Sequence, residues 1–219
     1  MAKIAPRLYL VRHGESEWNT ERRIQDNHSG NGLSEVGRRQ AQCLGARLRE
    51  QEFDTVYCSD VQRAVETAEI ALGRVDNIQF LDTLREISFG GWGGKQVEQI
   101  VKEYPGMMEK WFNKPTSVSI DGGEDMADFR KRVVKTFNEI TGRIDSENVL
   151  VITHGGVICS YLTYILGMDL DDLWSFSLPN ASLTIISMEY RPRLRLFGDT
   201  SHLDGKSLGF DGMPSVYDR

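Results

Sequence analysis

The sequence has little cysteine and histidine, and neither type forms a metal-binding pattern. Its three cysteines, Cys43, Cys58 and Cys159, include no C-x-x-C pair, and only four histidines occur in 219 residues. A zinc module is therefore not expected, and an odd number of cysteines in a mixed α/β chain favours reduced thiols. We expect the cysteines to be small buried apolar side chains, and we expect a cytoplasmic location.

The sequence also lacks an excess of basic residues and any long apolar run. Lys and Arg number 26 against 32 Asp and Glu, a net charge of −6, whereas a nucleic-acid-binding protein shows a basic patch or stripe. No apolar run approaches the roughly 18 residues of a membrane span, and no signal-peptide pattern opens the chain. We therefore expect neither nucleic acid nor a membrane as a partner. Any anion site must be built locally, against an overall negative field.

What is present is an alternation of strands and helices. Strands are predicted at six short apolar segments: 8–11, 55–57, 78–81, 149–152, 182–188 and 194–197. Helices are predicted after a capping Ser34, after a capping box of Ser59 and Gln62, and over 96–111 (interrupted at Pro105-Gly106), 126–144 and 157–166. This alternation predicts an α/β fold of three layers, α/β/α, with a mostly parallel central sheet.

The domain organisation follows from the same pass along the chain. We predict one domain over 1–198, in which the glycine-rich start of segment 88–123 marks a small inserted cap. Residues 199–219 are rich in Gly, Ser and Asp and are predicted to form a flexible C-terminal tail.

Two segments repeat one arrangement, in which an apolar run ends at a histidine followed by glycine. The first is LYLVRHG, which contains His13, and the second is VLVITHGG, which contains His154. In open α/β sheets, ligands bind at the carboxyl edge of the strands. Either histidine alone would be interpreted as a structural side chain, but an apolar strand rarely needs a titratable end. We therefore expect the two histidines to meet in one crevice as functional groups.

Cationic and amide side chains gather at the same predicted edge. Arg12 precedes His13, Asn19 follows six residues later, and Arg63 begins a helix just after a strand. A guanidinium offers a planar fork of donors that matches phosphate oxygens, and amides at a helix start add further donors. A single arginine on a helix is usually only solvated. Together with two histidines, these residues predict an anion pocket.

The complete set of motifs resembles that of the histidine phosphatase superfamily, which has the phosphoglycerate mutase-like fold, and in particular its bacterial-type phosphatase branch. The shared motifs are RHGE at 12–15, Asn19, LSEVG at 33–37, SDVQRAVETA at 59–68, Glu86 before FGGWGG, and HGG at 154–156. They run in family order from residue 8 to about 190. RHG alone would be a weak signal, whereas the full set is specific.

The resemblance implies a role for each residue. His13 would attack phosphorus and become a phosphohistidine, while Glu86 would protonate the leaving alcohol and afterwards activate water. The transferred oxygens would be held by Arg12, Asn19, Arg63 and His154, the last also counted as catalytic. This chemistry needs a neutral imidazole, a positioned acid and fixed cations. A metal ion at His13 and His154 would share its pocket with two arginines, which disfavours it, and no Walker loop is present. We predict neither a metal nor any other cofactor.

Glu86 has two interpretations. Near glycines a solvated loop carboxylate is common, but a carboxyl group that is buried beside a phosphate would stay protonated and serve as an acid. Its position in the family motif favours the acid. The neighbouring acidic residues have no such support: Glu15, Glu98 and Glu124.

Two features leave the substrate contacts open. The loop between Gln25 and Leu33 has Asp26 where the family has glycine, and it is one residue longer than usual, so inherited contacts there are in doubt. Trp92 and Trp111 of the predicted cap could contact a substrate, but aromatic residues in a cap more often serve packing.

We predict a metal-independent phosphatase that hydrolyses small soluble phosphomonoesters. One alternative is a cofactor-dependent phosphoglycerate mutase, which uses the same histidine, and another is a phospholigand-binding regulatory module without turnover. Mutases carry a longer connection with additional arginines, whereas the stretch from Ser88 to Glu124 contains only lysines as cations: Lys95, Lys102, Lys110 and Lys114. The expected partner is a small phosphorylated metabolite, and analogy with such folds adds a homodimer as an expectation.

Overall fold

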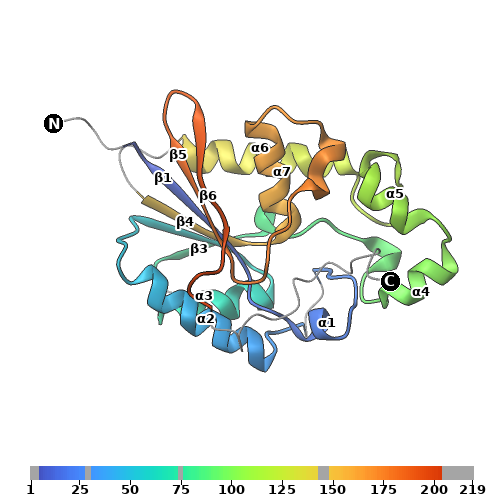
Figure 1. Cartoon of the computed structure of the whole chain (residues 1–219), viewed down its shortest axis with the longest axis horizontal. Coiled ribbons are helices and arrows are strands. Elements are labelled where there is room, and N and C mark those ends of the chain that lie inside the picture. Colours follow the sequence, from blue (N-terminus) through green and yellow to red (C-terminus); the bar gives the residue numbers. More distant parts are fainter. Residues whose placement is uncertain (1–4, 28–30, 74–75, 143–147, 204–219) are drawn as a thin grey trace.

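A single sheet forms the centre of the molecule (Figure 1). The computed structural model describes residues 5–27, 31–73, 76–142 and 148–203. Its six strands lie in the order β3-β2-β4-β1-β5-β6. They are β1 (Arg7–Arg12), β2 (Thr55–Ser59), β3 (Ile78–Leu81), β4 (Asn148–Thr153), β5 (Leu183–Met188) and β6 (Pro192–Asp199). The first four strands of that order run parallel, and β5 and β6 pair antiparallel at one edge, so the predicted mostly parallel sheet is confirmed.

Helices cover both faces of this sheet, as the α/β prediction requires. The α-helices are α1 (Glu17–Thr20), α2 (Glu35–Leu48), α3 (Gln62–Leu72), α4 (Val97–Glu103), α5 (Met107–Asn113), α6 (Met126–Thr141) and α7 (Gly155–Ile165). Four short 3₁₀ segments join them: η1 (Asp82–Leu84), η2 (Gly90–Trp92), η3 (Pro115–Ser117) and η4 (Leu170–Ser175). In Figure 1, α2 and α3 lie below the sheet, and α6 and α7 lie above it. None of the described helices is long and apolar enough to cross a membrane.

The alternation of side chains along β1 explains why this strand is apolar throughout. Leu8 and Leu10 pack into the cluster that contains the inner faces of α6 and α7. Tyr9 and Val11 point the other way, into the cluster that contains α2 and α3. Successive side chains of a strand face opposite sides, so a strand buried on both sides needs apolar residues at every position.

The predicted helix ends are right in one case and wrong in another. Ser34 caps α2, because its hydroxyl accepts a hydrogen bond from the Gly37 amide at 3.0 Å. The capping box of Ser59 and Gln62 is wrong: α3 begins after Val61, which has no side-chain cap, and Ser59 is buried at the end of β2. Residues 143–147, which include the last turn predicted for the helix over 126–144, lie outside the described residues.

The segment predicted as a cap, 88–123, carries η2, α4, α5 and η3 at one end of the molecule (Figure 1). The interruption at Pro105-Gly106 is present, and Gly106 separates the two helices with a φ of 78°. Side chains of this segment join the same core cluster as α6 and α7, among them Trp92, Met108 and Trp111. The division into a domain over 1–198 with this cap stays a prediction. Of the predicted tail, Asp199 belongs to β6, and 204–219 lie outside the described residues.

Candidate active site

The register of β1 and β4 brings the two histidines together. Arg12 pairs with Thr153 in the last rung of this parallel ladder, and the His13 amide donates to the Thr153 carbonyl at 2.9 Å. His13 and His154 are therefore each the first residue beyond the paired strands. Their ring centroids lie 5.2 Å apart, and both side chains are buried. The predicted meeting of the two histidines at the carboxyl edge is present in the structure.

The hydrogen bonds of His13 define its tautomer. Nδ1 lies 2.7 Å from the Gly14 carbonyl, which can only accept, so Nδ1 carries the proton. Nε2 accepts from the Arg63 guanidinium Nε–H at 3.2 Å and so presents its lone pair. Burial lowers the pKa of His13 well below 6.5, and the charges of Arg63 and Arg12 lower it further. The imidazole is therefore held neutral, the form that a nucleophile needs.

Arg63 is the fully buried cation behind His13. Its other two donors reach the Asp26 carbonyl and Nδ1 of His154, each at 3.0 Å. Burial lowers its pKa to about 10, which leaves the guanidinium charged at neutral pH. His154 completes the row, since its Nε2–H donates to the Ser59 hydroxyl at 2.8 Å. His154 thus has the opposite tautomer to His13, and its pKa is lowered by burial and then by Arg63.

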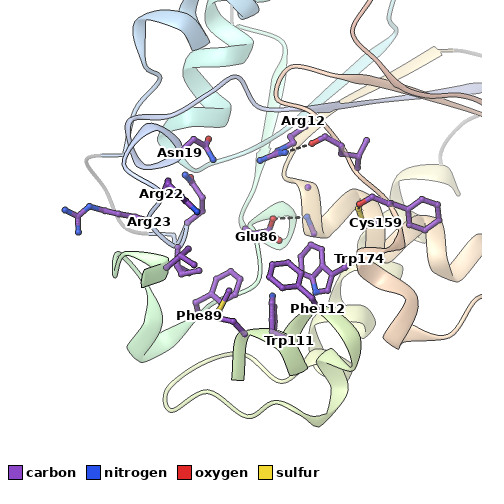
Figure 2. A pocket seen from close by; sticks show the side chains of 18 of the residues that line it. Arg12, Asn19, Arg22, Arg23, Glu86, Phe89, Trp111, Phe112, Cys159 and Trp174 are labelled. Atoms are coloured by element: carbon purple, nitrogen blue, oxygen red, sulfur yellow. Dashed lines mark hydrogen bonds between the residues drawn. The ribbon is translucent and has the colours of Figure 1, made fainter. Parts of the chain in front are cut away.

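A cavity opens in front of this row. Of the predicted phosphate-holding residues, Arg12 and Asn19 line it together with His13, whereas Arg63 and His154 do not. Arg12 donates through Nη1 to the Leu178 carbonyl. The Asn19 carbonyl oxygen is occupied by the amide and hydroxyl of Ser16, at 3.0 and 3.1 Å, so its amide nitrogen is the group that faces the cavity (Figure 2). Direct contact of Arg63 and His154 with a phosphate stays a prediction.

Glu86 lies on the wall of the same cavity. One carboxylate oxygen accepts from the Ile87 amide and the other from the Gly156 amide, both at 2.9 Å. Burial raises the pKa of Glu86, and this effect outweighs the opposing effects of the two amides, Arg63 and Arg12. Sterics explain why the second residue of HGG after His154 is a glycine, because a Cβ on Gly156 would lie 2.4 Å from a Glu86 oxygen. The carboxyl group is thus placed and tuned as a proton donor would need to be.

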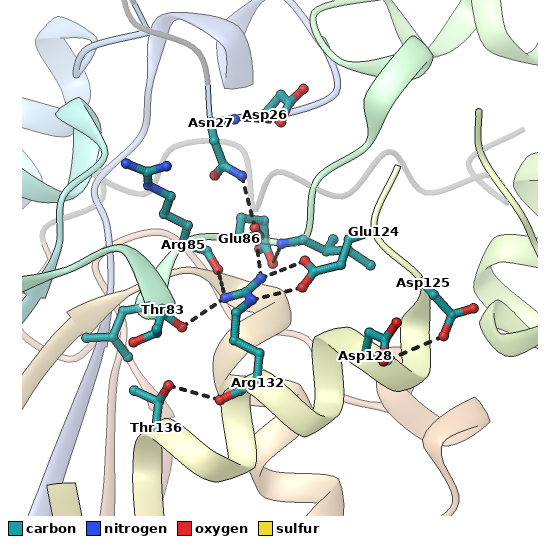
Figure 3. A network of polar contacts seen from close by, with 12 residues as sticks. Asp26, Asn27, Thr83, Arg85, Glu86, Glu124, Asp125, Asp128, Arg132 and Thr136 are labelled. Carbon is teal, nitrogen blue, oxygen red and sulfur yellow. Dashed lines mark hydrogen bonds and ion pairs between the residues drawn. The ribbon is translucent and has the colours of Figure 1, made fainter. Parts of the chain in front are cut away.

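A polar network on the far side of Glu86 holds its backbone (Figure 3). Arg132 of α6 donates to the carbonyls of Thr83 at 2.8 Å, Arg85 at 2.9 Å and Glu86 at 3.5 Å. The same guanidinium binds both oxygens of Glu124, at 2.9 and 2.6 Å. Sequence reasoning missed Arg132 and set Glu124 aside. A signal existed, because Arg132 is flanked on α6 by the buried Phe129 and Val133 and so borders the inner face of the helix.

Asp26, at the position where the family resemblance implies a glycine, is buried. Its backbone carbonyl accepts from Arg63, and its carboxylate lies against Gly93, where a Cβ would be 2.1 Å from an Asp26 oxygen. Asn27 next to it donates to the Glu86 carbonyl at 3.2 Å. The backbone of Asp26 therefore supports Arg63, and its neighbour Asn27 supports Glu86. Residues 28–30, within the lengthened loop, lie outside the described residues.

Of the other residues considered from the sequence, some line the cavity and some support the structure around it. Trp111 lines the cavity, while Trp92 is buried behind it, with ring centroids 6.5 Å apart. Glu15 is a buried structural residue that accepts from the Ser34 hydroxyl at 2.7 Å. Cys159 also lines the cavity, but burial raises its thiol pKa to about 12, which is unfavourable for a thiolate nucleophile.

Two more polar residues hold the row of histidines: Asn180, which the sequence did not single out, and Ser59, which it predicted as a helix cap. Asn180 donates to the His13 carbonyl at 3.2 Å, and the adjacent Ala181 amide donates to the same oxygen at 3.0 Å. Ala181 has a φ of 54°, a left-handed conformation that costs a non-glycine residue about 1 kcal/mol or more. Ser59, the partner of His154, lies at the end of β2. The rule that located His13 and His154, polar residues at strand ends, applies to Ser59 as well.

Three features meet at the edge of this α/β sheet: a neutral imidazole, a carboxyl group of raised pKa, and buried arginines. Together they define a site for phosphate-ester chemistry. Comparison with known proteins gives the family. The sequence profile of the histidine phosphatase superfamily (branch 1) matches residues 8–200. The chain therefore belongs to the histidine phosphatase superfamily.

Similar proteins in this family carry several activities in their names. The chain is 34% identical over 200 residues to phosphoserine phosphatase 1 of Hydrogenobacter thermophilus, covering 90% of this chain and 94% of the relative. It is 31% identical over 208 residues to a probable phosphoglycerate mutase GpmB of Salmonella choleraesuis, with 92% and 96% covered. Adenosylcobalamin/α-ribazole phosphatases of Salmonella typhimurium and Escherichia coli are also relatives. Among solved structures, Bacillus stearothermophilus YhfR matches with a TM-score of 0.84 and 35% identity, covering 90% of this chain and 99% of that one.

Proposed function

We propose that this protein is a phosphatase that hydrolyses small phosphomonoesters through a phosphohistidine on Nε2 of His13. The observation that carries the proposal is the tautomer of His13, whose unprotonated Nε2 belongs to a residue that lines the cavity. In the first step Nε2 forms a bond to phosphorus while the bond between phosphorus and the alcohol oxygen breaks. Glu86 gives its proton to that oxygen. In the second step Glu86 takes a proton from water, the water oxygen attacks phosphorus, and His13 is released with inorganic phosphate.

The other predicted residues have supporting roles in this proposal. Arg12 and the Asn19 amide nitrogen are in place to donate to the phosphoryl oxygens from the cavity wall. Arg63 donates to the lone pair of His13 Nε2 in the free protein. When a phosphoryl group binds, its oxygens replace that lone pair as the acceptor of the Arg63 hydrogen bond. His154 orients Arg63 by accepting from it through Nδ1, and direct contact of His154 with the phosphoryl oxygens is what the family resemblance implies. Fixed cations of this kind stabilise charge that spreads over the phosphoryl oxygens.

We also propose that the reaction needs no metal ion and takes place in the cytosol. In support of the first, the described residues contain no group of three His, Cys, Asp or Glu side chains that could hold a metal. In support of the second, the three cysteines, all within the described ranges, are free thiols. Exhaustive chelation should therefore leave turnover nearly unchanged, and a loss that an added divalent ion restores would contradict metal independence.

A mutase is the second candidate, because a probable mutase is among the relatives. A mutase must keep the phosphohistidine from water and hold a bisphosphate, which requires additional cations near the site. None of the four lysines between Ser88 and Glu124 lines the described cavity. The arginines that line it besides Arg12 are each paired with a carboxylate, Arg22 with Glu98 at 3.4 Å and Arg23 with Glu21. This arrangement favours water as the acceptor. A regulatory module without turnover would not need the acid, and Glu86 is both buried and in place.

One experiment tests these alternatives together. The protein is mixed with a ³²P-labelled phosphomonoester, quenched in denaturant and digested, while released phosphate is followed in parallel. We expect an acid-labile, alkali-stable label on His13, steady release of phosphate, and no stimulation by 2,3-bisphosphoglycerate. His13→Ala should abolish both label and release. Label on a serine, cysteine or aspartate would contradict the intermediate, and rapid interconversion of 2- and 3-phosphoglycerate with little free phosphate would establish the mutase.

A further inference from the structure

The cavity in front of His13 has an apolar wall opposite its charged end (Figure 2). Six of the residues that line it are large and apolar: Phe89, Met108, Trp111, Phe112, Trp174 and Phe176. They come from three separate parts of the chain, namely the start of the predicted cap, α5, and the η4 segment after α7. In Figure 2 the labelled rings of this wall gather at one end, Arg12 and Asn19 lie at the other, and Glu86 lies between them. A phosphoryl group at Arg12 therefore directs its ester substituent past Glu86 toward the rings.

The rings of this wall contact one another and form one surface. Ring centroids are 5.2 Å apart for Phe89 and Trp111, 5.9 Å for Trp111 and Trp174, and 6.2 Å for Phe112 and Trp174. These separations are typical of edge-to-face and tilted aromatic pairs. Phe112 and Trp174 are only partly buried, so they keep surface that a ligand can cover. A wall of this kind favours an apolar or aromatic substituent through area removed from water and through ring–ring contact.

The lining of the cavity offers little to pair with a substrate ammonium group. Glu86 is the only acidic side chain among the described residues that line the cavity, and both its oxygens already accept amide hydrogen bonds. Three arginines also line it: Arg12, Arg22 and Arg23. Arg22 and Arg23 are paired with Glu98 and Glu21. A substrate ammonium group would therefore find no carboxylate in this lining except Glu86, and it would have to shed water against the rings.

We propose that the natural substrate is a phosphomonoester of an alcohol that carries an uncharged aromatic ring, and that the wall formed by Phe112, Trp111 and Trp174 binds this ring. The inference rests on the proposed phosphatase function and names its substrate class. It differs from the class of phosphoserine and phosphoglycerate, because their substituents are too small to cover this apolar wall. The ring stacks on the wall, the ester oxygen lies beside Glu86, and the phosphoryl group reaches Arg12 and Nε2 of His13.

The test compares esters whose leaving groups are all primary alkoxides, so that leaving-group chemistry does not decide the outcome. The kcat/KM values are measured for 2-(2-naphthyl)ethyl phosphate, glycerol 1-phosphate and O-phosphoserine. Covering an aromatic ring system should favour the naphthyl ester by about 10- to 100-fold over glycerol 1-phosphate. O-Phosphoserine should be the poorest of the three. Equal values, or a preference for either small ester, would overturn the proposal while leaving the phosphatase function intact.

Variants assign the preference to the wall. Phe112→Ser should move the ratio of kcat/KM values for the naphthyl ester and glycerol 1-phosphate toward one, because it removes exposed ring surface. Phe80→Ser is the matched control: Phe80 is 42% exposed on β3 and does not line the cavity, so the ratio should stay as in the wild type. A ratio that survives Phe112→Ser would overturn the assignment to this wall. If no ester were turned over and no phosphohistidine formed, the proposed function itself would be overturned. The comparison of esters is made on the wild-type protein, so it can be read even if a variant fails to fold.

Discussion

The two ends of the cavity are built by different means. At the charged end, Arg12 and His13 line the cavity, and Arg63 and His154 lie behind them. These residues end a strand, directly follow one or lie in the first turn of a helix, so the sheet register fixes their positions. The aromatic end consists of side chains from the predicted cap and η4, which are held by packing against one another. The sheet thus positions the reacting groups, while the connections between its strands supply the surface that meets the rest of the substrate. A protein of this design can change its substrate without disturbing its chemistry.

The largest expected effect on kcat/KM comes from replacing the buried arginine behind the charged end, compared with replacing an exposed arginine of the cavity wall. Arg63→Met removes the buried cation that contacts both histidines and should lower kcat/KM by about 10³-fold or more, because fixed cations stabilise the transferring phosphoryl group. Arg22→Met removes a half-exposed arginine paired with Glu98 at 3.4 Å and should cost less than about tenfold. Both are measured with nitrophenyl phosphate, with thermal unfolding as the folding control. Equal losses of kcat/KM in the two variants would contradict the view that the buried Arg63 contributes more to catalysis than the half-exposed Arg22.

Glu86 separates the two regions and should have a selective effect. Glu86→Gln keeps the size and should lower turnover of alkyl phosphates by about 10²–10⁴-fold, the contribution of a general acid. Nitrophenyl phosphate, whose leaving group needs little protonation, should lose far less. The acid is competent below its pKa, which burial raises, so alkyl phosphate turnover in the wild type should fall as pH rises through that pKa. This fall should be absent in the Gln variant, and equal losses on both substrates would indicate a structural role.

Arg132 should have a smaller effect of the same kind, since it holds Glu86 through the backbone. Arg132→Met should lower alkyl phosphate turnover by about 10- to 100-fold, because a shift of about 1 Å in a catalytic group costs that much. Arg132→Lys keeps the charge without the planar fork and should recover only part of the loss. The decisive readout is the ratio of alkyl to nitrophenyl rates, which a general loss of stability would leave unchanged.

The smallest effect concerns stability and again distinguishes the two regions, since only the charged end titrates. The folded-state pKa values of His13 and His154 are lowered by burial, so the unfolded chain binds protons below pH 6.5 that the folded chain does not. The free energy of unfolding should therefore fall below pH 6.5, by at most about 1.4 kcal/mol per pH unit for each histidine. The raised pKa of Glu86 acts oppositely, with stability lost as pH rises above 4.5. Urea unfolding between pH 5.5 and 7.5 measures the slope, and His13→Gln should reduce it. An equal slope in both proteins would contradict the assignment of this pH dependence to the buried histidines.

The same contrast explains what could be predicted from the sequence. The strands and the residues at their ends were predictable, because a strand with two buried faces is apolar at every position and its polar end is conspicuous. The pairing of Arg12 with Thr153 then brings His13 and His154 together without further information. The family motif supplied Glu86.

Residues that act across separate segments were not predictable in this way. Arg132 reaches Glu86 only after α6 packs on the sheet, and Asn180 reaches His13 from the far end of the chain. The aromatic wall depends on how the predicted cap meets η4, which no local pattern records. Ser59 was misassigned as a helix cap because its spacing to Gln62 satisfied a local rule, whereas its hydroxyl accepts from His154 at 2.8 Å.

The pairing of β1 with β4 also has a consequence for folding. The paired residues Arg12 and Thr153 are 141 positions apart in the sequence. Closing so long a loop is entropically slow compared with forming helices or neighbouring strand pairs. Because β1 lies beside β4 and not beside β2, the strand that precedes Arg63, His13 cannot reach Arg63 until the β1–β4 ladder is complete up to Arg12 and Thr153. A partly folded chain with its helices formed is therefore inactive toward phosphate esters. Recovered turnover after dilution from denaturant therefore reports when this long-range strand pairing is complete.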